Sequence, residues 1–191
     1  VTAVTNAAGT DGGLFTLDAD GTVSFDPNGQ FGNLAVGESR TTSYTYTLVD
    51  ADGGTDTAVI TVTVTGVNDR PVIVDPITKV PVTGVIDPTT GLPVDPTTGE
   101  PSQPIGAQTG TDSQGGISID VGSFVIDPDT TDVLTFTATG LPDGLVIDPD
   151  TGVITGTIDS SASQGGTGGV YSVVVTVTDG NGGTLTLTFP Y

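Results

Sequence analysis

The sequence predicts an all-β protein made of tandem antiparallel β-sandwiches. Its apolar residues are mostly Val, Ile, Leu and Ala beside many Thr, and β-branched side chains suit a pleated, half-buried surface. These residues alternate with polar ones in short blocks bounded by Gly, Asp or Asn, which is the pattern of strands and turns. A length of 191 residues fits two sandwich modules of about 100 residues each.

Strands are expected wherever the period-two alternation is clear, and no segment shows a helical period. The expected strands of the first half are 14–17, 22–25, 43–49 and 58–64. Those of the second half are 117–120, 133–139, 144–147, 153–157, 171–178 and 184–189. One unit of strand, acidic turn and Thr-rich strand occurs twice, at 46–54 and 175–183, which indicates tandem modules.

The segment between the two halves is rich in Pro and Thr and contains the near copies 87–93 and 95–101. Proline removes ladder donors and favours turns or extended geometry, so residues 73–116 are predicted to be a Pro/Thr/Gly-rich linker or a long loop. The predicted modules are then residues 1–72 and 117–191.

The formal charge of −20, from 23 acidic and three basic residues, excludes nucleic acid as a partner, because phosphate binding needs clustered Lys or Arg. Divalent cations would neutralise so many carboxylates; a solvated acidic surface is the alternative. Without His or Cys, any metal should be a hard cation such as calcium. No apolar run is long enough to insert in a membrane.

Catalysis finds little support in the residues. The sequence has no His, no Cys, one Lys and no nucleophile motif such as Gly-x-Ser-x-Gly. Paired carboxylates could cleave glycosides, but such sites generally add aromatic residues that hold the sugar, and Trp is absent. We therefore expect a protein that is not an enzyme.

Two motifs carry a resemblance to known families. The run Thr61 to Val72, with Asn68-Asp69-Arg70-Pro71 after a strand, resembles the end of bacterial cadherin-like and VCBS repeats. The stretch 124–189, with Asp127-Pro128-Asp129, 140–145 and 150–156, resembles a dystroglycan-type cadherin-like ("putative Ig") module. The first module departs from its family because strands that normally precede Val1 are absent. The resemblance implies Ig-like/cadherin-like sandwiches of a giant type I-secreted RTX adhesin.

The same resemblance implies where calcium would bind. In cadherin-like arrays the ion lies at the module junction, and by motif its ligands here would be Asp50 and Asp52, Asn68 and Asp69, then Asp127 and Asp129, with Asp179 also in the downstream set. Asp132 could complete the Asp127 group, because Asp-x-Asp-x-x-Asp on a turn can direct several carboxylates to one point. The alternative is that these residues form capped or solvated turns. The segments 148–152 and 181–182 are interpreted as simple turns.

Three functions follow as expectations. The first is a calcium-rigidified extender of a secreted bacterial cell-surface adhesin in adhesion or biofilm formation, a monomer whose partners are the neighbouring modules of a long chain. The second is a calcium-dependent module that recognises a peptide or glycan on a host or bacterial surface. The third is self-association through exposed strand edges.

Overall fold

The computed structural model describes residues 4–79, 81–82 and 104–191. The chain divides into two compact units, Val1–Asn68 with Asp129–Thr131, and Asp69–Pro128 with Asp132–Tyr191. Among the described residues the regular elements are strands and two short 3-10 helices, which confirms the all-β prediction. None of the helices in the described ranges is long or apolar enough to cross a membrane.

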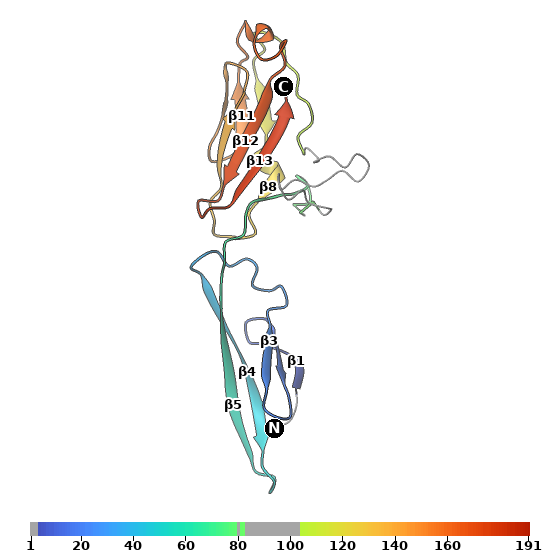
Figure 1. Cartoon of the computed structure of the whole chain (residues 1–191), viewed down its shortest axis with the longest axis vertical. Coiled ribbons are helices and arrows are strands. Elements are labelled where there is room, and N and C mark those ends of the chain that lie inside the picture. Colours follow the sequence, from blue (N-terminus) through green and yellow to red (C-terminus); the bar gives the residue numbers. More distant parts are fainter. Residues whose placement is uncertain (1–3, 80, 83–103) are drawn as a thin grey trace. The chain divides into compact units, whose positions relative to one another are not determined.

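The first unit contains a three-stranded sheet in the order β1-β2-β3 and the long hairpin β4-β5 (Figure 1). The strands are β1 (Val4–Ala8), β2 (Leu14–Leu17), β3 (Val23–Asp26), β4 (Ser39–Val49) and β5 (Thr55–Thr65). Phe15, Leu17 and Phe31 are buried, and Phe15 stacks on Tyr44 of the hairpin at 6.0 Å between ring centroids. Thr42 Oγ1 ties the hairpin to the loop after β1 by donating to Gly12 O at 2.8 Å.

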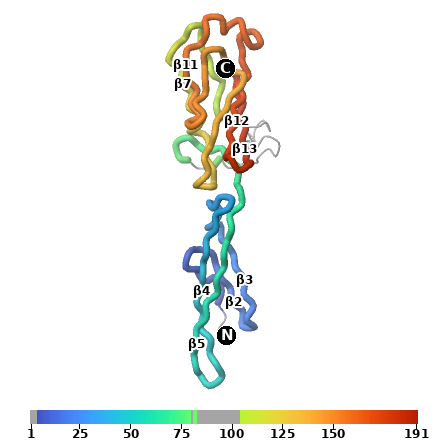
Figure 2. Tube along the Cα trace, turned by 90° about the vertical axis from the view of Figure 1, so that its left-hand side faces the viewer, coloured from blue at the N-terminus to red at the C-terminus, as the bar shows by residue number. Residues whose placement is uncertain are grey.

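The second unit is a sandwich of two three-stranded antiparallel sheets, β10-β11-β7 and β13-β12-β9, with the short pair β6-β8. Figure 2 shows β7 and β11 on one side and β12 and β13 on the other. The strands are β6 (Val72–Ile73), β7 (Ile117–Asp120), β8 (Val125–Ile126), β9 (Thr135–Thr139), β10 (Leu145–Ile147), β11 (Val153–Gly156), β12 (Ser172–Thr178) and β13 (Thr184–Pro190). The 3-10 helices are η1 (Gly122–Phe124) and η2 (Ala162–Gln164).

The core of the second unit comes from the inward residues of both sheets. Val173, Val175 and Val177 alternate along β12 with no exposed surface, as the period-two pattern predicts for a sheet with one buried face. Ile154 of β11 lies in the same core, also fully buried. This packing holds the ends of the strands in fixed positions, where the loops that carry acidic residues begin.

The ten expected strands all occur, with ends shifted by at most a few residues except at β4, which begins at Ser39 instead of residue 43. The sequence did not predict β6 or β8, because two-residue strands are too short to show alternation. β1 is also absent from the expected strands, because its residues do not alternate regularly between apolar and polar. Of the segment predicted as linker or long loop, Ile73 and Ile105 are buried in the core of the second unit. Residues 80 and 83–103 of that segment lie outside the described residues, and the domain boundaries stay a prediction.

Candidate metal centre

Three carboxylates gather at one end of the second sandwich. Each of Asp127, Asp132 and Asp179 offers one oxygen, and these three atoms lie within 4.8 Å of one another. Asp127 follows β8, Asp132 precedes β9, and Asp179 follows β12. In the described parts of the chain, these three residues form the group of acidic side chains whose oxygens lie close enough together to share one ion.

Asp179 is held by the turn that joins β12 to β13. Its Oδ1 accepts hydrogen bonds from Asn181 N at 2.7 Å and from Gly183 N at 2.9 Å. The side chain is only 3% exposed, although it is a carboxylate. The Asp residue closes the turn by bonding to backbone two and four residues ahead, so its position is set by local chemistry.

Gly183 allows the β12-β13 turn to lie close to Arg70, in the segment that begins the second unit. A Cβ at this position would overlap Asp179 Oδ2 and would lie 2.9 Å from Arg70 Cα. The backbone of Arg70 therefore passes directly beside the acidic turn. A role for Asp69, the neighbour of Arg70 in the chain, as an ion ligand stays a prediction.

Asn181 joins the cluster from the tip of the turn. Its Nδ2 donates to Asp132 Oδ2 at 2.9 Å, which fixes Asp132 relative to the β12-β13 turn. The sequence predicted only a tight turn at residues 181–182 and did not indicate this contact. The signal available in the sequence was the position of Asn181, two residues after the candidate ligand Asp179. Its hydrogen-bond partner Asp132 could not be identified, because it is 49 positions away in sequence.

The electrostatics of the cluster favour a cation. Asp127 and Asp132 are half-buried, Asp179 is buried, and Asp127 Oδ2 is a buried atom. Two ionised carboxylates at 4.8 Å repel by about 3 kcal/mol at an effective dielectric constant of 20. Oxygen ligands on turns are also the donor set that Ca²⁺ uses in proteins. The residues present therefore fit a hard divalent cation.

The other predicted ligands are placed as follows. Asn68 belongs to the first unit, and so does Asp129, which is 1% exposed, whereas Asp69, Asp127 and Asp132 belong to the second. Of the three residues in the Asp-x-Asp-x-x-Asp spacing, Asp127 and Asp132 lie close together, with Asp179 as the third member of the cluster. Ligation itself stays a prediction for all of them.

Asp50 and Asp52 do not fit a site shared with Asn68. They lie in the turn of the β4-β5 hairpin, next to the pair Val49 and Thr55, whereas Asn68 follows the opposite end, where Ser39 pairs with Thr65. Ten steps along an antiparallel strand span about 34 Å. One ion cannot bridge that distance, so the assignment of Asp50 and Asp52 to the junction ligands is corrected.

The two acidic turns nevertheless have the same structure. Asp50 Oδ1 accepts from Asp52 N at 3.0 Å and from Gly54 N at 2.7 Å, as Asp179 Oδ1 does from the equivalent residues. The turn at Asp50 is exposed, and no group of three acidic side chains forms there among the described residues. The difference between the turns therefore lies in their surroundings.

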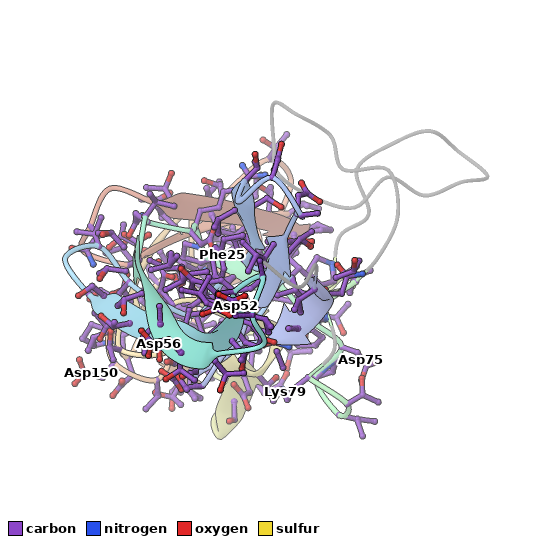
Figure 3. The ribbon with its side chains drawn as sticks, turned by 90° about the horizontal axis from the view of Figure 1, so that it is seen from below. Phe25, Asp52, Asp56, Asp75, Lys79 and Asp150 are labelled. Carbon is purple, nitrogen blue, oxygen red and sulfur yellow. The ribbon has the colours of Figure 1, made fainter. Side chains whose placement is uncertain are left out.

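Asp148 acts in an ordinary turn. Asp148 begins the β10-β11 turn and accepts hydrogen bonds from Thr151 N at 2.8 Å and Asp150 N at 3.0 Å, which confirms the predicted hairpin. These bonds, with one from the Thr151 hydroxyl, lower the pKa of Asp148. Asp75 and Asp150, both in the second unit, lie on opposite sides of Figure 3, so the acidity is spread over the surface outside the cluster.

Family models match both halves of the chain. The "Putative Ig domain" model matches residues 95–191, about half of the chain, and the chain belongs to this family. A bacterial Ig domain model matches residues 1–63. The chain is therefore an Ig-like β-sandwich protein. Its family is that of the putative Ig domain, which the second half matches. A search of curated proteins finds no match.

Solved structures of similar shape include several cadherins. Mouse cadherin-23 EC22-24 has 14% identity and a TM-score of 0.47, over 96% of this chain and 50% of that one. Drosophila N-cadherin EC1-4 has 13% identity and a TM-score of 0.39, over 100% and 41%. An endo-fucoidan hydrolase of glycoside hydrolase family 107 has 20% identity and a TM-score of 0.37, over 99% and 23%. The chain thus spans half or less of these structures.

Proposed function

We propose that this chain is a calcium-rigidified extender region of a bacterial cell-surface adhesin, with a role in adhesion or biofilm formation. The observation that carries the proposal is the cluster of Asp127, Asp132 and Asp179, whose oxygens lie within 4.8 Å of one another. The bacterial Ig domain match at residues 1–63 and the membership of the Ig-like family support an extracellular structural module.

Calcium is the cation that the donor set favours. All three cluster side chains are carboxylates, and the chain has no His or Cys to attract zinc, copper or iron. Ca²⁺ takes six to eight oxygen ligands and accepts backbone carbonyls and water in addition to carboxylates. Asp127, Asp132 and Asp179 would supply the charged ligands, and the ion would remove the repulsion among them.

The ion would act on two loops at once. It would tie the β8-β9 loop, which carries Asp127 and Asp132, to the β12-β13 turn, which carries Asp179. Since the two loops are far apart in sequence, their joint restraint would be a tertiary effect. Metal binding of this kind adds its binding free energy to the stability of the folded unit.

Calcium-dependent rigidity would be useful to a secreted protein. Calcium is abundant outside a cell and scarce within it, so the modules would become rigid only after export. The proposal includes no catalytic activity, because the folded unit serves as a spacer between neighbouring modules of a longer chain. It also expects a monomer, because a charge of −20 opposes the approach of a second copy.

Calorimetric titration of Ca²⁺ into the chain and two variants tests the proposal. Asp179→Asn should abolish the binding heat, because it removes a charged ligand and leaves the Oδ1 acceptor of the turn in place. Asp50→Asn is the matched control, since Asp50 makes the same turn without two acidic neighbours, and it should bind like the unchanged chain. Equal titrations for all three proteins would refute calcium binding at the cluster.

A further inference from the structure

The second unit has a groove at the end of the sandwich opposite the acidic cluster. It encloses about 760 Å³ and lies between the segment 107–112, the loop that contains η2, and the C-terminal residues Pro190 and Tyr191. The cluster adjoins the pair Thr178 and Thr184, whereas Ser172 pairs with Pro190 at the groove. Six strand steps of about 3.4 Å separate the two ends by about 20 Å.

Two tyrosines take part in lining this groove from neighbouring positions. Tyr171 N donates to Tyr191 O, and Tyr191 N donates to Tyr171 O, both at 2.9 Å. A pair that exchanges both backbone bonds places its side chains on the same face of the sheet. Both rings are half-buried.

Two glycines make room for these rings. A Cβ on Gly110 would lie 2.9 Å from the Tyr191 hydroxyl, and a Cβ on Gly165 would overlap the Tyr171 hydroxyl. Tyr171 is further fixed because its hydroxyl donates to Ala162 O at 2.9 Å. Burial raises the pKa of Tyr191, so its phenol stays protonated at neutral pH. The aromatic surface is therefore preformed.

Asp112 is the charged side chain among the described residues that line the groove. Ser163 donates its N–H to Asp112 Oδ1 at 2.7 Å and its hydroxyl to Asp112 Oδ2 at 2.6 Å, and Gln108 Nε2 donates to Gly106 O at 3.0 Å. These donors, like the Tyr171 hydroxyl, are used within the protein. Each oxygen of Asp112 retains a lone pair, because a carboxylate has about four acceptor sites.

The negative charge of the chain favours a positively charged ligand. Only Arg40, Arg70 and Lys79 oppose the 23 acidic residues, and none of the three lines the groove. An anionic ligand would be repelled, whereas a cation would be attracted to Asp112. A guanidinium group supplies five donors in one plane, stacks on tyrosine and carries the complementary charge.

We propose that this groove binds an extended peptide segment of a partner protein through an arginine side chain, which stacks on Tyr191 and donates to Asp112. Such a site gives the module a second activity, recognition of a basic surface peptide, in addition to its role as a spacer. The site does not use the acidic cluster, so the test of peptide binding is independent of the test of calcium binding.

Tyrosine fluorescence of the full chain tests the proposal, because the chain lacks Trp and two of its four Tyr line the groove. The probe is a blocked Gly-Gly-Arg-Gly-Gly peptide, compared with peptides that carry Lys or Leu in place of Arg. The arginine peptide should change the emission and bind about tenfold more tightly than the lysine peptide, since only a guanidinium both stacks and donates in a plane. Titrations with 10 mM Ca²⁺ and with a chelator should agree whenever circular dichroism shows the chain folded.

Variants separate groove binding from general attraction. Tyr191→Leu should remove binding, while Tyr46→Leu, a change to a first-unit tyrosine, should not. Asp112→Asn should weaken binding about tenfold. Asp120→Asn removes the same charge from another exposed residue that also accepts from a serine N–H, Ser123 N at 3.0 Å, and should have little effect. The proposal would be overturned if the two Asp variants lost binding equally, or if the Lys peptide bound as tightly as the Arg peptide. It would also be overturned if a neutral oligosaccharide changed the emission and the peptides did not.

Discussion

Removal of calcium is expected to lower the stability of the second unit. Extracellular modules commonly bind Ca²⁺ with dissociation constants of about 0.1–1 mM, so 10 mM Ca²⁺ would exceed the constant by roughly 10- to 100-fold. Binding to the folded state alone then stabilises it by about 1.4–2.7 kcal/mol. For a unit of this size, with about 4 °C of melting temperature per kcal/mol, the expected rise is roughly 6–11 °C.

The assay is a calorimetric melt in 10 mM Ca²⁺ and again in excess chelator. The carboxylates of Asp127, Asp132 and Asp179 repel by about 3 kcal/mol per ionised pair at an effective dielectric constant of 20, less where solvent screens them, so the chelated protein should melt lower. Mg²⁺ at the same concentration is the control, because it demands a smaller octahedral site and should raise the melting temperature less. An identical melt in calcium and in chelator would refute the reasoning and leave the acidity as surface charge.

Three further perturbations test the fold around the site. Ile154→Ala removes a fully buried side chain and should cost about 2–5 kcal/mol in urea unfolding, whereas Val146→Ala, at a 65% exposed position, should change stability by less than about 0.5 kcal/mol. Gly183→Ala forces a Cβ onto Asp179 Oδ2 and should weaken calcium binding in the calorimeter; unchanged affinity would show that the turn is not part of the site. The pKa of Asp148 is lowered in the folded state, so its contribution to stability is present above the unfolded pKa and is lost as pH falls through the folded value. Thermal melts from pH 6 to pH 2 should therefore fall less steeply for Asp148→Asn, and parallel curves would contradict this.

Most strands could be predicted from the sequence because their signal is local. In β12 the alternation of buried Val with partly exposed residues is complete over seven positions, and the Gly-rich turn after it marks the end. The pair β6-β8 has no such signal. It forms because Val72 meets Ile126 across 54 positions, and only the packed sandwich brings these residues together.

The candidate site shows the same division. The spacing of Asp127 and Asp132 predicted one acidic group, and the structure brings them together with Asp179. The motif also suggested Asp50 as a junction ligand, but sequence order does not reveal that a hairpin of two 11-residue strands carries that turn away from Asn68. The length of β4 was underestimated, since its first residues, Ser39 to Thr42, lack clear apolar alternation.

The two acidic turns carry one further consequence. Each turn is closed by its own Asp through bonds to backbone N–H groups, so its shape is complete before any ion arrives. Whether such a turn could hold a metal then depends on residues from another loop, such as Asp127 and Asp132, which lie beside Asp179. In a chain of duplicated modules, a metal site can therefore be gained or lost by substitutions outside the hairpin. The same inherited turn can serve as an ion ligand in one repeat and as a plain hairpin in the next.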